Sequence, residues 1–162
     1  CPRGGLRHAL SGLEGRISEV NAALEQRTLS IRTNGRSLIP LGEEVQGALQ
    51  ASPFTCGLCT LFVAHTSASL LINEGADPEV TRDLERFFAR LVPDGDPLFL
   101  HRAEGPDDMP AHVRTALTQT SLSLPFANGT LSLGTWQEVF LWEHRHAPHT
   151  RSISLTLIGE AT

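Results

Sequence analysis

The spacing of apolar residues divides the first part of the chain into helical and extended segments. Residues 11–27 carry apolar side chains at helical intervals, and we expect an amphipathic helix in an N-terminal extension spanning residues 1–27. Residues 28–33 then alternate apolar and polar side chains as a strand does, and the Asn-Gly pair at 34–35 is typical of a hairpin turn. Residues 40–52 return to helical spacing.

A longer helix is predicted directly after residue 77. Asp77 is a suitable N-cap and Pro78 a suitable first-turn residue, while Pro93 ends the segment. The apolar residues of this segment form one helical stripe, which we expect to be part of the core: Val80, Leu84, Phe87, Phe88 and Leu91.

Most of the remaining chain consists of short extended segments. The predicted strands are 58–65, 68–73, 97–101, 121–126, 130–136, 137–145 and 151–159. An Asn-Gly pair at 128–129 predicts a tight hairpin. Segment 137–145 has large apolar residues on both faces, so both faces require cover from a second layer or from another subunit. These elements predict an α+β fold, a single domain with a largely antiparallel β-sheet or sandwich and two or three packed helices.

The composition favours one compact domain and narrows the choice of partners. The 162 residues are 40% hydrophobic and carry a formal net charge of −5 at pH 7, without a cluster of Lys and Arg. An acidic chain of this kind argues against a nucleic-acid partner. No apolar stretch approaches the roughly 20 residues that span a bilayer, and no secretory signal pattern is found, so we expect a cytoplasmic protein without membrane contact.

Several familiar catalytic motifs are incomplete in this sequence. Cys56 and Cys59 have C-x-x-C spacing without a second pair, so we expect a structural role, with redox or metal binding as the alternative. Ser67 lies near a histidine but lacks the G-x-S-x-G turn of a hydrolase nucleophile. Neither of the common Gly-rich phosphate loops is present.

Three histidines stand where an expected regular element meets a loop. His65 and His101 each end an apolar segment, and His112 lies in the first turn of a short helix predicted over 107–118. Such junctions often assemble sites on a rigid scaffold. Three neutral imidazoles suit Zn²⁺ and leave a coordination position for water or substrate. The alternative is that they are core, surface or hydrogen-bonding histidines, because no compact ligand motif fixes their geometry.

Acidic residues accompany these histidines. Glu74 follows the strand after His65, and Asp107 and Asp108 precede His112. Carboxylates here could orient an imidazole, bind a cation, or act as general acid or base, the last role falling to Glu74 or Asp108. The simpler alternative for either aspartate is a helix N-cap.

A further polar group lies near the C-terminus. Alternation places Gln137, Glu143 and Arg145 on one strand face, where Arg145 could contact a phosphate or a carboxylate. An internal ion pair of Glu143 with Arg145 or Arg151 is the alternative. The full set of candidates for substrate contact is Ser67, Asn73, Asp107, Gln137, Glu143 and Arg151, beside the catalytic candidates Glu74, Asp108 and Arg145.

Four stretches of the sequence together resemble a known family. They are HTSASLLINE, HRAEGPDDMPAHV, LSLPFANGTLSLGTWQEVFLWEHR and RSISLTLIGE, in this order. They resemble the YjbQ family, also called the secondary thiamine-phosphate synthase family, from about residue 28 to 160, within a YjbQ-like domain of residues 28–162. The resemblance implies a YjbQ-like subunit that assembles as a homotrimer, with a divalent metal on the motif histidines His65, His101 and His112. Zn²⁺ is the expected ion, and Mg²⁺ is the alternative for a diphosphate substrate.

The activity linked to that family implies one reaction for this chain, and two other functions are alternatives to it. The reaction is a weak joining of hydroxymethylpyrimidine diphosphate to thiazole phosphate, which releases pyrophosphate and gives thiamine phosphate. The departing diphosphate needs its charge neutralised, a task suited to a divalent ion and Arg. A small phosphorylated heterocyclic metabolite is therefore the expected partner of a transferase. A metal-dependent hydrolase of a small phosphorylated metabolite and a non-catalytic trimer that binds metal or ligand stay open as alternatives.

Overall fold

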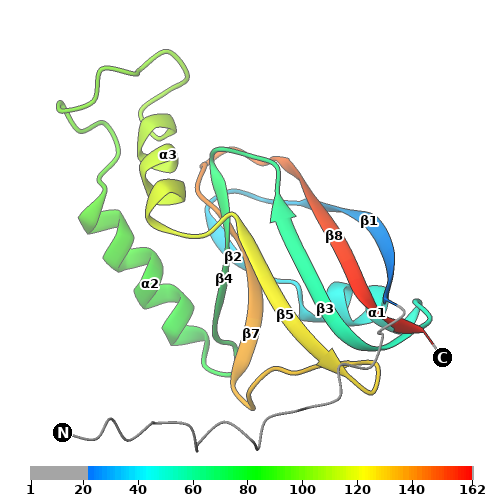
Figure 1. The fold of residues 1–162 in the computed structure, drawn as a ribbon. Helices are drawn as coiled ribbons and strands as arrows, with labels where there is room; N and C mark the ends of the chain where they lie inside the picture. Colours follow the sequence, from blue (N-terminus) through cyan, green and yellow to red (C-terminus); the bar gives the residue numbers. More distant parts are fainter. Residues whose placement is uncertain (1–21, 162) are drawn as a thin grey trace, which may run out of the picture.

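Eight strands and three helices make up the computed structural model, which describes residues 22–161 (Figure 1). The elements are β1 (Ala22–Arg32), β2 (Ser37–Pro40), α1 (Gly42–Gln50), β3 (Phe54–Val63), β4 (Ala68–Glu74), α2 (Pro78–Leu91), α3 (Asp108–Leu117), β5 (Ser121–Ala127), β6 (Thr130–Leu131), β7 (Gln137–Glu143) and β8 (Thr150–Ala161). One sheet has the strand order β1-β8-β3-β5-β6, and the other has the order β2-β7-β4. Neighbouring strands are antiparallel, so the predicted single α+β domain with antiparallel sheets is confirmed. Within residues 22–161, no helix has the length and apolar character to cross a membrane.

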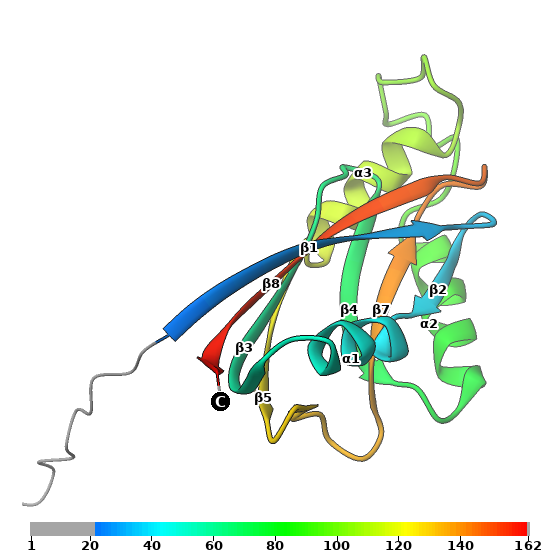
Figure 2. The same ribbon diagram turned by 90° about the vertical axis from the view of Figure 1, so that its right-hand side faces the viewer.

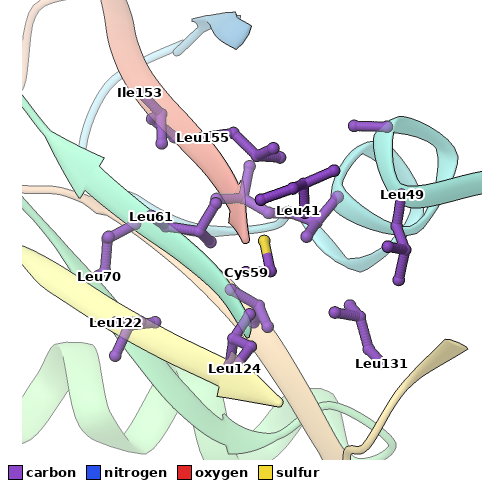
Figure 3. Packing of buried hydrophobic residues seen from close by; sticks show 14 of the residues in the cluster. Leu41, Leu49, Cys59, Leu61, Leu70, Leu122, Leu124, Leu131, Ile153 and Leu155 are labelled. Carbon is purple, nitrogen blue, oxygen red and sulfur yellow. The ribbon is translucent and has the colours of Figure 1, made fainter. Parts of the chain in front are cut away.

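The hydrophobic core lies between the two sheets and includes one face of α1 (Figures 2 and 3). Strand β8 illustrates the pattern, because Ile153, Leu155 and Leu157 are buried while the residues between them point away from the core. Leu61 of β3 and Leu49 of α1 belong to the same buried cluster. The alternation of apolar and polar residues thus determines which face of the large sheet packs on the small one.

Strand β7 is buried on both faces by its own chain. Val139 and Leu141 belong to the core cluster between the sheets, while Phe140 and Trp142, which are also buried, alternate with them. Helix α2 covers Trp142, and the ring of Phe88 lies edge-on to the Trp142 ring with 4.7 Å between centroids. A second layer therefore accounts for this strand, and its apolar faces do not by themselves require another subunit.

The apolar stripe of α2 is not core, contrary to expectation. The predicted N-cap is confirmed, since the Asp77 carboxylate accepts a hydrogen bond from the Glu79 amide. No residue of α2 is buried, however, and Phe87 and Leu91 are 50% and 54% exposed. The helix lies on the outer face of a sheet of only three strands, so part of its wide apolar stripe extends beyond the surface that it covers (Figure 1).

The predicted N-terminal helix is wrong over its last residues. Residues 22–27 are the first half of β1, which pairs with β8 continuously from Ala22 to Arg32. The long strand β8 offers a full ladder of backbone partners, and these bonds override the local helical spacing. The rest of the predicted helix, residues 11–21, lies outside the described residues.

One of the two Asn-Gly pairs forms a hairpin, and two of the predicted strands are absent or shortened. The pair at 128–129 forms the predicted hairpin between β5 and β6, with positive φ at both residues, 53° and 67°. The hairpin predicted at 34–35 is wrong: this pair turns the chain from one sheet to the other, because β1 pairs with β8 and β2 pairs with β7. Segment 97–101 is a loop, and only Thr130–Leu131 of the predicted strand 130–136 pairs.

Candidate metal centre

Three side chains converge at the N-terminal end of α3. They are His101 from the preceding loop and Asp108 and His112 of the helix, and one ligand atom of each lies within 4.8 Å of the others. Asp108 Oδ2 is 2.8 Å from His101 Nε2 and 3.3 Å from His112 Nε2. The Asp108 side chain is 2% exposed, whereas those of His101 and His112 are 46% and 31% exposed. The carboxylate therefore lies at the base of a group that opens to solvent.

The helix brings two members of this group together by its repeat. Asp108 and His112 are four residues apart, so they lie one above the other on the same face of α3. Asp107 occupies the N-cap position, but its side chain makes no capping hydrogen bond. The N-cap interpretation of Asp107 thus holds for its position and not for its carboxylate.

Arg145 fixes the two aspartates in place. Its guanidinium donates to Asp107 Oδ2 over 3.1 Å, to Asp108 Oδ1, and to the carbonyl oxygen of Glu104 over 2.8 Å. Burial raises the pKa of Asp107, but hydrogen bonds from the His146 amide and from Arg145 outweigh it and hold that pKa below its usual range. Arg145 therefore contacts carboxylates, one of the two kinds of partner that we expected for it, and these contacts position Asp107 and Asp108.

Hydrogen bonding defines which nitrogen of His112 carries a proton. His112 Nδ1 lies 2.9 Å from the carbonyl oxygen of Thr66, which can only accept, so Nδ1 is the donor. In the neutral ring, Nε2 then presents a lone pair to Asp108 Oδ2. Two lone pairs at this distance repel each other unless a proton or a metal ion lies between them.

The donor set matches a metal site of the two-histidine, one-carboxylate type. Two ligand atoms on a tetrahedral zinc ion lie about 3.3 Å apart, since each bond is roughly 2.0–2.1 Å long, and His112 Nε2 and Asp108 Oδ2 already have this separation. Two imidazoles and one carboxylate suit zinc or iron(II) and leave positions for water or substrate. Mg²⁺ fits less well, because it prefers a shell of oxygen ligands.

Two hollows of the surface adjoin this group. One is a cup of about 230 Å³ that His101 lines together with residues of the loop before α3. The other is a shallow depression of about 470 Å³ that His112 lines together with His65 and several threonines. The metal-type group therefore has one hollow on the His101 side and another on the His112 side.

His65 belongs to the second hollow and not to the three-membered group. Its Nε2 accepts a hydrogen bond of 2.9 Å from the Ser152 amide, so Nδ1 carries the proton of the neutral ring. Burial and the charge of Arg151 lower the pKa of His65, which favours that neutral form. Asp108 stands in the structure where the sequence led us to expect His65, as the third potential ligand beside His101 and His112.

Glu143 and Arg151 form an ion pair between the two sheets, as one of our alternatives predicted. Arg151 Nη2 lies 2.5 Å from Glu143 Oε1, and Arg151 Nε donates to Glu143 Oε2 over 2.7 Å. Thr33 donates to Glu143, and Ser67 Oγ accepts from Arg151. Arg145 contacts Glu143 only through its backbone amide. Glu143, Arg151 and Ser67 thus satisfy one another inside the protein rather than facing a hollow.

Three predicted site residues lie at the other end of the small sheet. Asn73 and Glu74 end β4, and Glu74 pairs with Gln137 at the start of β7. The opposite end of β4, at Ala68, lies two residues after Thr66, whose carbonyl oxygen contacts His112. Six residue steps, or roughly 20 Å of extended strand, separate Glu74 from Ala68. Asn73 Oδ1 accepts from the Glu74 amide, and Gln137 Oε1 accepts from the Gly134 amide. The structure does not bring these three residues to the group at α3.

The cysteine pair takes no part in the site. Cys59 is buried in the core, and burial raises the pKa of its thiol to about 11. Cys56 is half-buried near the other end of β3, with its sulfur 3.7 Å from a carboxylate oxygen of Glu160. This arrangement agrees with the structural role that we expected.

Comparisons with known proteins identify the family. The fold and the site define a class of protein, an antiparallel α+β sandwich with a solvent-open His/Asp group at α3. Residues 27–160 match the family described as "UPF0047 protein YjbQ-like". UPF0047 protein sll1880 of Synechocystis is 53% identical over 135 residues, which cover 83% of this chain and 92% of that protein. YjbQ of Escherichia coli O157:H7 is 43% identical over 136 residues, covering 83% and 98%.

A solved structure agrees with this assignment. The conserved hypothetical protein TT1486 of Thermus thermophilus superimposes with a TM-score of 0.73 at 36% identity, covering 81% of this chain and 98% of that one. The chain belongs to the UPF0047 YjbQ-like family, as the four sequence stretches predicted. The names of these relatives state no activity.

Proposed function

We propose that this chain is a divalent-metal-dependent enzyme that acts on a small phosphorylated molecule, by transfer of the thiamine-phosphate synthase type. The observation that carries this proposal is the group of His101, Asp108 and His112, which is open to solvent and has a hollow on each side. Two hollows beside one group suit two reactants that must meet. A hydrolase would need room for one substrate and a water molecule.

The side chains of the site have distinct roles in this proposal. His101, Asp108 and His112 would hold the ion, which when bound would supply a Lewis acid against the charge of a departing diphosphate. Arg145 donates a hydrogen bond to Asp108 Oδ1 and so holds the Asp108 carboxylate in place. His65, with its proton on Nδ1, would offer a hydrogen-bond donor to a reactant in the second hollow. His65 is thus assigned to substrate contact rather than to the metal.

Product analysis tests the reaction. We expect protein purified without an affinity tag and loaded with Zn²⁺ to convert hydroxymethylpyrimidine diphosphate and thiazole phosphate to thiamine phosphate and pyrophosphate. His112→Ala should abolish this turnover, whereas His146→Ala, at a histidine whose side chain is 59% exposed and bonded to Asp94, should retain it. If the protein instead cleaves simple phosphate esters in a metal-dependent way and transfers no group, the chain is a hydrolase and the proposed transferase function is wrong. Bound zinc with neither activity would contradict an enzymatic role.

We also propose that copies of this chain associate through the outer face of the five-stranded sheet. Three successive rows across β1, β8, β3 and β5 carry no charged residue on this face. The rows are Leu24, Ile158, Leu58 and Pro125, then Gln26, Thr156, Thr60 and Ser123, then Thr28, Ser154, Phe62 and Ser121. Depletion of charge with exposed apolar side chains is typical of the centre of a protein interface. A highly charged partner would meet no opposite charges on these three rows, whereas a second copy of the chain presents an equally uncharged surface.

Light scattering tests this association. We expect a homotrimer of about 53 kDa, three times the 17.6 kDa of the chain. Phe62→Glu, in the middle of the neutral face where Phe62 is 48% exposed, should shift the protein to monomer. Leu100→Glu is the matched control, because Leu100 is 94% exposed in the loop before α3. A monomeric wild type, or dissociation by Leu100→Glu alone, would show that this face is not the interface.

A further inference from the structure

The cup on the His101 side is built almost entirely by the chain segment between α2 and α3. Its apolar lining comes from Phe99, Pro106, Met109 and Pro110, and its volume is about 230 Å³. His101 forms part of the same lining, so the cup is continuous with the candidate metal centre. None of the other residues that we assigned to the site from the sequence lines it.

Backbone hydrogen bonds hold this segment in shape. The Gly95 amide donates to the Pro106 carbonyl oxygen over 2.9 Å, which ties the two ends of the loop together. Gly95 has a positive φ of 70°, a conformation that suits glycine. The Phe99 amide donates to the carbonyl oxygen of Asp96, and Arg102 Nε donates to that of Phe99. These bonds fix Phe99 within a closed loop, so hydrogen bonds of the loop itself hold the cup in shape.

Phe99 is the one apolar side chain of its tripeptide that points inward. Leu98 and Leu100 are 78% and 94% exposed, whereas Phe99 is half-buried and lines the cup. Exposure that alternates from one residue to the next is typical of a strand. In this loop the alternation turns one aromatic ring, that of Phe99, toward the inside. The ring, the Met109 thioether and two prolines make a surface suited to the face of another ring.

We propose that this cup binds one planar ring of the substrate, aromatic or heteroaromatic, whose oxygen-rich substituent reaches the centre at His101. An apolar cavity of about 150 Å³ accommodates benzene, so a cup of about 230 Å³ takes one substituted ring. Nucleotide-sized ligands need larger pockets, generally above about 300 Å³. The reach of the substituent to a metal rests on the proposed function, whereas the binding of the ring does not.

The sequence offers a specific reporter for this proposal. Met109 is the one methionine in the 162 residues, so ¹³C-methyl methionine labelling places an NMR signal inside the cup. The probes are benzyl alcohol, benzyl phosphate and inorganic phosphate, each titrated into wild type with and without Zn²⁺. Met109→Leu assigns the signal and separates it from any initiator methionine of the expressed protein.

We expect both benzyl compounds to shift the Met109 methyl signal, with benzyl phosphate binding at least about tenfold more tightly than inorganic phosphate because its ring is removed from water. Phe99→Ala should remove this advantage. Phe87→Ala, which truncates an exposed ring on α2, is the matched control and should leave it unchanged. If neither benzyl compound moves the signal, or if inorganic phosphate moves it equally, the cup does not bind a ring.

The two proposals fail separately in this experiment. Zn²⁺ should strengthen binding of benzyl phosphate and leave binding of benzyl alcohol unchanged, which would confirm both the ring site and the metal beside it. Ring binding without any effect of Zn²⁺ would support the cup and contradict the metal-dependent function. Zn²⁺ binding with no response at Met109 would overturn the cup and leave the metal centre standing.

Discussion

Replacing His112 with alanine is expected to lower the affinity for Zn²⁺ by at least about 100-fold, because even residues that merely orient a ligand change metal affinity by about 10–100-fold. His112 Nε2 faces the same carboxylate oxygen as His101 Nε2, and the Thr66 carbonyl already orients its lone pair toward that oxygen. The binding site is thus largely preformed. Competition against a chromophoric chelator at fixed pH measures the affinity.

His65→Ala is the matched comparison for this prediction. His65 uses Nε2 to accept the Ser152 amide and lies outside the three-membered group, so its removal should change the zinc affinity by less than about threefold. Asp108→Asn should weaken binding as His112→Ala does, since it replaces an anionic ligand by a neutral one. Equal losses of zinc in His65→Ala and His112→Ala would restore the three-histidine site and contradict the assignment of Asp108.

Replacing Arg151 with methionine is expected to lower the free energy of unfolding by about 3–5 kcal/mol, the usual cost of leaving a buried charge without its partner. Glu143 is fully buried and Arg151 is 4% exposed, so no solvent replaces the lost contacts. Equilibrium denaturation in urea measures the loss. With typical domain stabilities of about 5–15 kcal/mol, such a variant would be close to unfolding at room temperature.

The same ion pair makes stability depend on acid. Burial raises the pKa of Glu143, but hydrogen bonds from Arg151, the Arg145 amide and Thr33 outweigh it, and the pKa is lowered overall. A carboxyl with a lowered folded-state pKa stabilises the protein above its ordinary value of about 4.3, and that contribution disappears as the pH falls through the lowered value. Stability should therefore fall below about pH 4, and this decline should be shallower in Arg151→Met.

Two further variants separate this pair from a general loss of arginine. Arg32→Met removes an exposed arginine at the end of β1 and should change the free energy of unfolding by less than about 0.5 kcal/mol. A double replacement, Glu143→Leu with Arg151→Met, should recover at least half of the single-variant loss, because an apolar pair of similar size has no charge to desolvate. Similar losses for Arg32→Met and Arg151→Met would contradict the role of the buried pair.

Most helices and strands were predictable from the sequence. Which neighbouring elements cover or pair with them was less predictable. Short extended segments bounded by turn residues identified most of the strands, and the Asn-Gly pair at 128–129 identified the hairpin, because both signals are local. The burial of α2 was not predictable in this way. Its stripe shows which side of the helix meets the protein, but the area covered depends on a three-stranded sheet assembled from distant segments. Residues 22–27 were misassigned for the same reason, since β8 supplies their partners.

The candidate site was predicted in part. His101 and His112 were correctly predicted to be neighbours, because His101 shortly precedes α3 and His112 lies within it. The four-residue spacing of Asp108 and His112 is a usable signal for a shared helical face, and it favours Asp108 over a third histidine as the neighbour of His112. Nothing in the local sequence shows that the His65 ring turns to the Ser152 amide, or that Arg145 reaches both aspartates at α3. Those contacts are products of the tertiary fold.

The most direct test of the metal centre is an anomalous difference map at the zinc edge from crystals of the zinc-loaded protein. The structure leads us to expect one strong peak, roughly 2.0–2.2 Å from His101 Nε2, His112 Nε2 and Asp108 Oδ2. A peak bonded to His65 in place of Asp108, or full zinc occupancy at some other position with none at α3, would contradict the account.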